Sequence, residues 1–162
     1  MKIRDRIFYY YLQVAFIVFV LVLTSCTKEK NIVAKQRIFD LLKSYDLEHS
    51  TNTLIYYFIP LDGCGECIKT SIEFVNKNFN LNNVDFILIS QLKKSYNMNF
   101  SKDVLKRENV IIDEKQLSKI YELVSNKPII YVFNNGKIEF IFELDDQNSQ
   151  KILGAIFSEF IE

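Results

Sequence analysis

The sequence predicts an α/β domain with a mixed central sheet, flanking helices and an antiparallel hairpin near its C-terminal end. Two observations predict this fold class. The apolar runs 54–59 and 84–89 are separated by a helical pattern, which is typical of a right-handed parallel strand–helix–strand unit. The later apolar stretches 129–133 and 137–143 are separated only by Asn134-Asn135-Gly136, which is typical of an antiparallel hairpin.

The first residues of the chain have the pattern of an export signal. Lys2, Arg4 and Arg6 precede the uncharged, mostly apolar run 7–23. The run ends in Leu23-Thr24-Ser25-Cys26, which resembles the bacterial lipoprotein box, where the signal is cut before the cysteine and acyl chains are attached to it. The alternative is an uncleaved membrane helix with an incidental cysteine. Both interpretations place the remaining chain on the non-cytoplasmic side.

This resemblance divides the chain into a signal peptide over 1–25, a lipidated tether over 26–31 and one folded domain over 32–162. If Cys26 carries the lipid, Cys64 and Cys67 are the one cysteine pair that is left. They would lie in a compartment where disulfides persist. The formal net charge is zero, so no basic field favours nucleic acid as a partner.

In the first half of the domain, each element of the predicted α/β fold has its own sequence pattern. Apolar residues at helical spacing predict a helix over 32–47, and the continuous apolar run 54–59 predicts a buried strand. A second helix is expected over 68–79 and a second buried strand over 84–89. The polar segment 91–108 has no clear periodicity.

The second half is predicted from shorter signals. Ser101 is expected to cap a short helix, and 110–112 to form a short strand that ends at Asp113. Asp113 is expected to cap a helix with apolar positions between 117 and 124. The hairpin follows, and apolar residues at helical spacing predict a last helix over 152–160.

The motif Cys64-Gly65-Glu66-Cys67 lies between a buried strand and an amphipathic helix, and Pro128 opens the hairpin about sixty residues later. In this order of parts the chain resembles the thioredoxin fold, and within it the membrane-tethered TlpA-like thiol–disulfide oxidoreductases. The likeness extends over 32–162. Three features differ from the family: Gly63 replaces an aromatic residue, the strand 54–59 lacks a carboxylate, and Gly-Glu separates the cysteines.

A thiolate is the nucleophile of disulfide exchange, and a helix N-terminus favours an anion. Cys64 is therefore expected in the exposed first turn, with Cys67 one turn later as the resolving cysteine, and Gly63 is expected to make the turn into the helix. The resemblance implies that Pro128 is a cis-proline beside the pair. Glu66 should raise the thiol pKa values and Lys127 should lower that of Cys64, unless both are solvated surface charges.

Two alternatives stay open at this point. The cysteines could form a merely structural disulfide in a binding lipoprotein, or they could supply half of a zinc or copper site. The second set of metal ligands is missing, because His49, the only histidine, is expected to be solvated or to cap a helix. No metal and no cofactor is therefore predicted.

The favoured hypothesis is a lipid-anchored thiol–disulfide oxidoreductase of the bacterial cell envelope, facing the periplasm or the cell surface. Its partners would be disulfide-containing exported proteins and an extracytoplasmic thiol electron donor.

Overall fold

The computed structural model of the protein describes residues 30–47, 55–63 and 65–160. The chain separates into two compact units, Met1–Ala34 and Lys35–Glu162, and the fold described here belongs to the second unit. The predicted signal peptide and Cys26 lie outside the described residues, as do His49 and Cys64. Among the helices that the structure describes, none combines the length and apolar content needed to cross a membrane.

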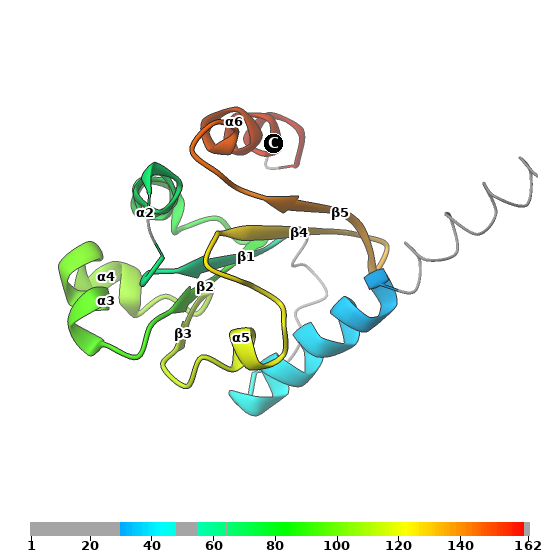
Figure 1. The fold of residues 1–162 in the computed structure, drawn as a ribbon, viewed down its shortest axis with the longest axis horizontal. Coiled ribbons are helices and arrows are strands. Elements are labelled where there is room, and N and C mark those ends of the chain that lie inside the picture. Colours follow the sequence, from blue (N-terminus) through cyan, green and yellow to red (C-terminus); the bar gives the residue numbers. More distant parts are fainter. Residues whose placement is uncertain (1–29, 48–54, 64, 161–162) are drawn as a thin grey trace, which may run out of the picture. The chain divides into compact units, whose positions relative to one another are not determined.

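Five strands form one mixed sheet in the order β3-β2-β1-β4-β5 (Figure 1). The strands are β1 (Ile55–Pro60), β2 (Val84–Ile89), β3 (Val110–Asp113), β4 (Ile129–Asn134) and β5 (Lys137–Glu143). The first three are parallel to one another, and β4 and β5 are antiparallel additions beside β1. The predicted fold class, a mixed sheet with a C-terminal hairpin and flanking helices, is confirmed.

Helices cover both faces of this sheet (Figure 1). The described helices are 30–44, α2 (Glu66–Asn78), α3 (Lys93–Asn99), α4 (Lys102–Leu105), α5 (Leu117–Ile120) and α6 (Ser149–Phe160). Figure 1 shows α2 and α6 on one face, with residues 35–44 and α5 on the other. Contacts between α2 and α6 and between α2 and β1 hold the first layer together.

Strand β1 lies at the centre and is buried along its whole length. Its side chains alternate between the two faces, as the pleat of a strand requires. Tyr57 packs toward α2, where its ring lies 6.1 Å from that of Phe74. Tyr56 instead makes an edge contact with Phe133 of β4, 5.3 Å away between ring centroids. Burial on both faces explains why this strand is a continuous apolar run.

The turn between β4 and β5 has the residues that a two-residue hairpin requires. Asn135 and Gly136 both have positive φ, 50° and 69°, which suits a type I′ turn because its two central residues need left-handed backbone. The antiparallel pairing continues to Ile129 and Glu143, with one register shift after Val132.

The segment between β2 and β4 differs most from the prediction. Ser101 does cap α4, accepting a hydrogen bond from the Val104 N–H at 3.4 Å. Helix α3 was not predicted at all, and α5 is only one turn long. The helix stops there because Glu122 adopts φ of 55°, so Ile120 is 67% exposed although Val124 is buried.

Candidate functional site

The site centres on Cys67, which is 3% exposed at the start of α2. The helix begins at Glu66, with Gly65 as its N-cap at φ of 102° and ψ of 174°. These angles are outside the helical region, so the helix starts only after Gly65. Cys67, which was expected one turn into the helix, stands in its first turn. The expected position of Cys64 falls outside the described residues.

Gly63 brings two loops into contact. A methyl group on Gly63 would overlap the backbone carbonyl oxygen of Asn126, so no larger residue fits without a shift. The glycine also closes a turn, donating its N–H to the Pro60 carbonyl at 3.0 Å. Its φ is not positive, so its role here is close approach of backbone and not a special backbone angle. The cysteine loop therefore lies against the loop that leads to Pro128.

Asp62 ties the cysteine loop to the loops that follow β2 and β3. Its carboxylate accepts a hydrogen bond from the Ser90 hydroxyl at 2.7 Å and a longer one from the Gln116 amide at 3.3 Å. Ser90 is fully buried at the end of β2. The chain two residues before Cys64 is thus tied to the carboxyl ends of the parallel strands.

Asp146 is the charged residue that contacts Cys67. It comes from the loop between β5 and α6, and its Oδ1 accepts the Cys67 backbone N–H at 2.8 Å. The same carboxylate hydrogen-bonds the Cys67 side chain. Sequence reasoning missed Asp146, because it lies 79 residues from Cys67 and belongs to no local motif. The adjacent acids Asp145 and Asp146, between hairpin and helix, were the available signal.

The environment of Cys67 disfavours its thiolate. Burial raises the pKa of the Cys67 thiol, and the Asp146 charge and hydrogen bond raise it further. Backbone N–H groups of the first turn act in the opposite direction. Glu66, which was expected to raise the thiol pKa values, is exposed and lies 3.5 Å from the ammonium of Lys69. The carboxylate that contacts Cys67 is therefore Asp146.

A buried hydroxyl chain supports the first turn of α2. The Ser71 hydroxyl donates to the Cys67 carbonyl at 2.6 Å, and the Tyr57 hydroxyl donates to Ser71 at 2.6 Å. Both residues are almost completely buried. Because each buried polar group has a partner, the turn that carries Cys67 is fixed to β1.

Lys127 lies close enough to Cys67 to interact with it electrostatically, although its main partner is Glu143. The Lys127 ammonium and the Glu143 carboxylate are 3.2 Å apart. Their hydrogen bond and opposite charges raise the pKa of Lys127, and Cys67 is the weakest contributor.

Pro128 follows a trans peptide bond, because the described residues contain no cis peptide. The expectation of a cis-proline is therefore wrong for this structure, which has the isomer that X–Pro bonds generally prefer. Its carbonyl accepts the Leu144 N–H at 2.8 Å, which extends the pairing of the hairpin by one bond.

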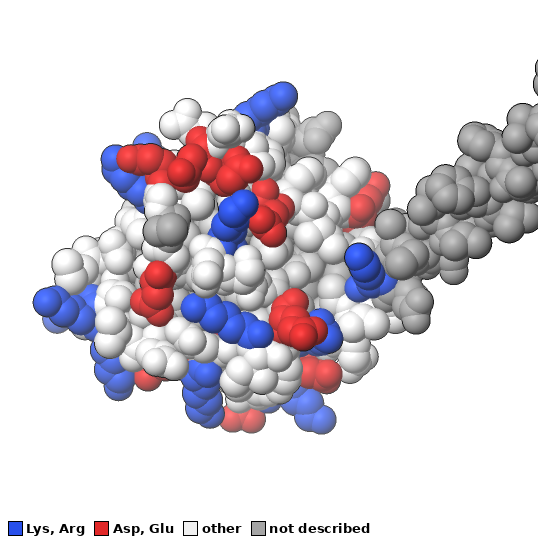
Figure 2. Space-filling model, viewed as in Figure 1, with Lys and Arg blue, Asp and Glu red and all other residues white. Residues whose placement is uncertain are grey.

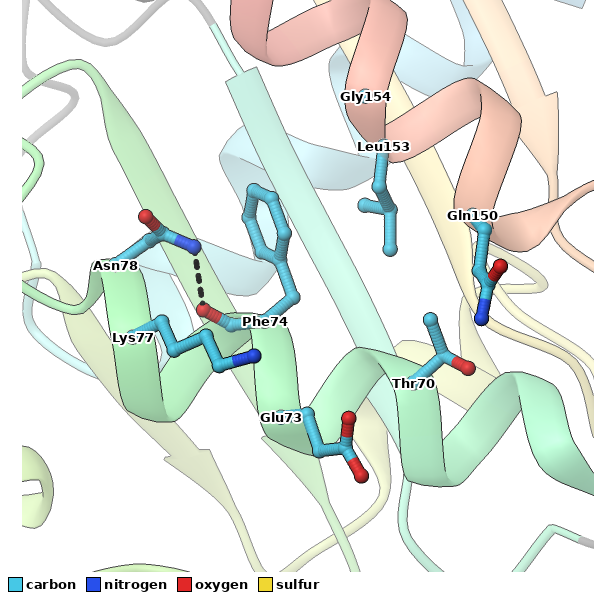
Figure 3. Close-up of a pocket in the computed structure, with 8 residues that line it drawn as sticks. All are labelled: Thr70, Glu73, Phe74, Lys77, Asn78, Gln150, Leu153 and Gly154. Carbon is cyan, nitrogen blue, oxygen red and sulfur yellow. Dashed lines mark hydrogen bonds between the residues drawn. The ribbon is translucent and has the colours of Figure 1, made fainter.

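No group of three or more His, Cys, Asp or Glu side chains in the described part of the chain is arranged to hold a metal ion. A groove of about 450 Å³ runs between α2 and α6 (Figure 3). Its lining on α2 begins at Thr70, beyond the first turn, and Leu153 and Gly154 contribute from α6. Figure 2 shows acidic side chains gathered where Figure 1 draws these two helices.

The strand order and the helices on both faces of the sheet agree with the predicted thioredoxin-like α/β fold. Among solved structures, the chain is similar to a Chlorobium tepidum protein assigned as the thiol:disulfide interchange protein DsbE. The TM-score is 0.42 at 16% identity, covering 67% of this chain and 80% of that one. No family model and no curated protein matches the sequence.

Proposed function

We propose that the protein is a thiol–disulfide oxidoreductase that acts through Cys64 and Cys67. The observation that carries the proposal is the position of Cys67, buried in the first turn of α2 with its N–H and side chain on Asp146. A buried thiol three residues after a second cysteine suits the resolving role, because it reacts only once its neighbour has formed a mixed disulfide.

In the proposed reaction, the Cys64 thiolate attacks a sulfur of the substrate disulfide and displaces the other substrate sulfur as a thiolate. The Cys67 sulfur then attacks Cys64, which forms the Cys64–Cys67 disulfide and releases the second substrate thiol. The substrate gains two electrons and the cysteine pair loses them. An external dithiol must reduce the pair again before another cycle.

The surrounding residues support this chemistry in different ways. Gly63 lies against the backbone of Asn126, and we propose that this brings Lys127 and Pro128 to the cysteine motif. The Lys127 ammonium interacts electrostatically with Cys67, and we propose that it lowers the thiol pKa of Cys64 as well. Glu66 stands at the exposed start of α2, where we propose that it opposes this effect.

We place the enzyme in the bacterial cell envelope, held by acyl chains on Cys26 and facing the periplasm or the cell surface. The proposal rests on the basic and apolar N-terminal pattern and on the Leu-Thr-Ser-Cys box. Its substrates would then be exported proteins with disulfides. Labelled palmitate should be incorporated by the intact chain and not by a Cys26→Ser variant.

Trapping of mixed disulfides tests the reaction. The Cys67→Ser variant should accumulate covalent adducts through Cys64, because nothing resolves them, and reducing agent should release the adducts. The matched Cys64→Ser variant should trap almost none, since Cys67 is 3% exposed. An oxidoreductase role is excluded if Cys67→Ser traps no partner and the intact protein reduces no model disulfide; a structural bridge would then explain the pair.

A further inference from the structure

The groove between α2 and α6 has an apolar floor. Phe74 of α2 and Leu153 of α6 point into the space between the two helices (Figure 3). The same two side chains also line a void of about 10 Å³ whose walls carry no polar surface. A void without polar partners stays dry, and the atoms around it lack contacts on one side. The floor of the groove therefore gains contacts when an apolar group enters from outside.

Gly154 leaves one wall of the groove bare. It lies inside α6, where glycine is less favourable than alanine because it loses more backbone freedom on folding. Nothing from the rest of the described fold lies within 4 Å of the position where its Cβ would stand, so close packing does not account for it. A glycine at such a place lets the backbone of another chain approach closely.

Two opposite charges stand at the edge of the groove. Glu73 and Lys77 are exposed and lie four residues apart on α2, which is about 6 Å along the helix axis. A glutamate four residues before a lysine is the order that favours an ion pair within a helix. Neither side chain forms an ion pair with another residue that the structure describes. Both charges are therefore available to a ligand.

Three further side chains of the groove are polar and uncharged. Thr70 and Gln150 approach each other from α2 and α6 at one end, and Asn78 lies at the other (Figure 3). Asn78 donates its amide N–H to the Phe74 carbonyl at 2.8 Å, which leaves its side-chain oxygen as an acceptor. Hydroxyl and amide groups can donate to a peptide backbone and accept from it. The groove thus combines apolar contacts, opposite charges and neutral hydrogen-bonding groups.

We propose that the groove binds an extended segment of another protein in which an apolar residue stands between a basic and an acidic one. An extended chain advances about 3.3 Å per residue, so the two residues that flank the apolar one lie about 6.6 Å apart and point the same way. This spacing matches that of Glu73 and Lys77, which bind the basic and the acidic side chain. The middle side chain points the opposite way, toward the apolar floor.

The inference goes beyond the proposed function and does not depend on it. The groove contains no cysteine among its described residues, and its lining on α2 begins at Thr70, after the turn that holds Cys67. Binding of a segment there forms and breaks no covalent bond.

Capped, dye-labelled peptides test the site in the full chain, held in detergent micelles, with empty micelles as the blank. The probes are Lys-Leu-Glu and Glu-Leu-Lys between glycines, because the groove admits either chain direction. Fluorescence anisotropy should give a Kd below about 1 mM for at least one of them. Replacing the leucine of that peptide by glycine should weaken binding at least about tenfold, because the buried apolar side chain is lost.

Two variants place the peptide in this groove. Gly154→Leu fills the bare wall and should weaken binding at least about tenfold, whereas Ala155→Leu, at the exposed next residue outside the groove lining, should leave it unchanged. Lys77→Glu keeps the groove open and serves if Gly154→Leu does not fold. It should reverse the charge preference, so that Lys-Leu-Lys binds severalfold more tightly than the peptide chosen by the wild-type protein.

The inference is overturned if neither peptide binds at about 1 mM, or if Gly154→Leu and Ala155→Leu bind equally well. An unchanged charge preference in Lys77→Glu would also overturn it. Peptide binding that disappears as the protein concentration rises would assign the groove to a second copy of the chain instead. None of these measurements uses the cysteines, so each outcome leaves the proposed function to its own test.

Discussion

Gly65 shows how one residue shapes the site. Its φ of 102° lies in a region that side-chain-bearing residues rarely adopt, and the Asp146 carboxylate fills the space where a Cβ would be. Both constraints act at the residue between Cys64 and the first turn of α2. Gly154 on α6 is the opposite case, since nothing lies within 4 Å of the position where its Cβ would stand.

These two glycines give a matched prediction. Gly65→Ala should lower the free energy of unfolding by about 1–3 kcal/mol, because it adds backbone strain and displaces Asp146. Gly154→Ala should raise it by about 0.5–1 kcal/mol, because alanine restricts the unfolded chain and favours a helix. Urea unfolding of the three proteins measures both effects. Equal stability of Gly65→Ala and wild type would contradict the close packing of Asp146.

At the scale of elements, Asp113 joins three pieces of the fold. It is fully buried at the end of β3, and its carboxylate accepts the N–H groups of Leu117 at 2.9 Å and Ser118 at 2.8 Å. The Tyr45 hydroxyl, which follows the helix 30–44, donates to the same carboxylate. The short α5 has too few internal bonds to stand alone, so Asp113 holds it in place.

Asp113→Ala should therefore reduce the free energy of unfolding by about 2–4 kcal/mol, since it leaves buried donors without an acceptor. The adjacent Glu114→Ala is the control. Glu114 makes an exposed, 3.9 Å ion pair with Lys93, and its removal should cost less than about 0.5 kcal/mol. Chemical denaturation compares the two variants. Similar losses in both would show that Asp113 does not anchor α5.

At the scale of the whole molecule, four of the tyrosine hydroxyls that the structure describes lie wholly or partly inside the fold: Tyr45, Tyr57, Tyr96 and Tyr131. Burial raises the pKa of each above the ordinary value of 10.0, and that of Tyr131 reaches about 12. Each hydroxyl has a hydrogen-bond partner inside the protein. The Tyr131 hydroxyl, for example, donates to the Leu123 carbonyl at 2.6 Å.

These shifts predict alkaline unfolding. A raised pKa means that the folded protein keeps its proton after the unfolded chain has lost it. Tyrosine therefore leaves stability unchanged below about pH 10 and lowers it as pH rises from about 10 to 12, by about 1.4 kcal/mol per pH unit for each proton held. Urea midpoints against pH measure the slope, which Tyr131→Phe should reduce by about one proton. A slope unchanged in Tyr131→Phe would contradict the burial of this hydroxyl.

The elements that the sequence predicted well are those specified by local patterns. The strand pair 54–59 and 84–89, the helix between them and the hairpin turn at Asn135-Gly136 all appear close to the expected residues. Ser101 likewise caps its own helix. Periodicity, turn chemistry and capping act over a few residues, so they can be read from the sequence.

The features that the sequence did not predict depend on contacts outside these local patterns. Helix α3 lacks an apolar stripe, and the start of α2 depends on the backbone angles of Gly65. The isomer before Pro128 is a balance of about 0.5–1 kcal/mol in an isolated chain, so the surrounding fold decides it. Asp146 belongs to no local motif with Cys67, because 79 residues separate the two in the sequence.

The sequence by itself determined the α/β class, the parallel strand–helix–strand unit, the hairpin and the spacing of the cysteine motif. Only the tertiary structure decided that Asp146 and not Glu66 contacts Cys67, that Gly63 meets Asn126, and that Pro128 is trans. Hydrophobic periodicity and turn preferences belong to neighbouring residues. Contacts across 79 residues exist only after the sheet has brought the loop between β5 and α6 beside the start of α2.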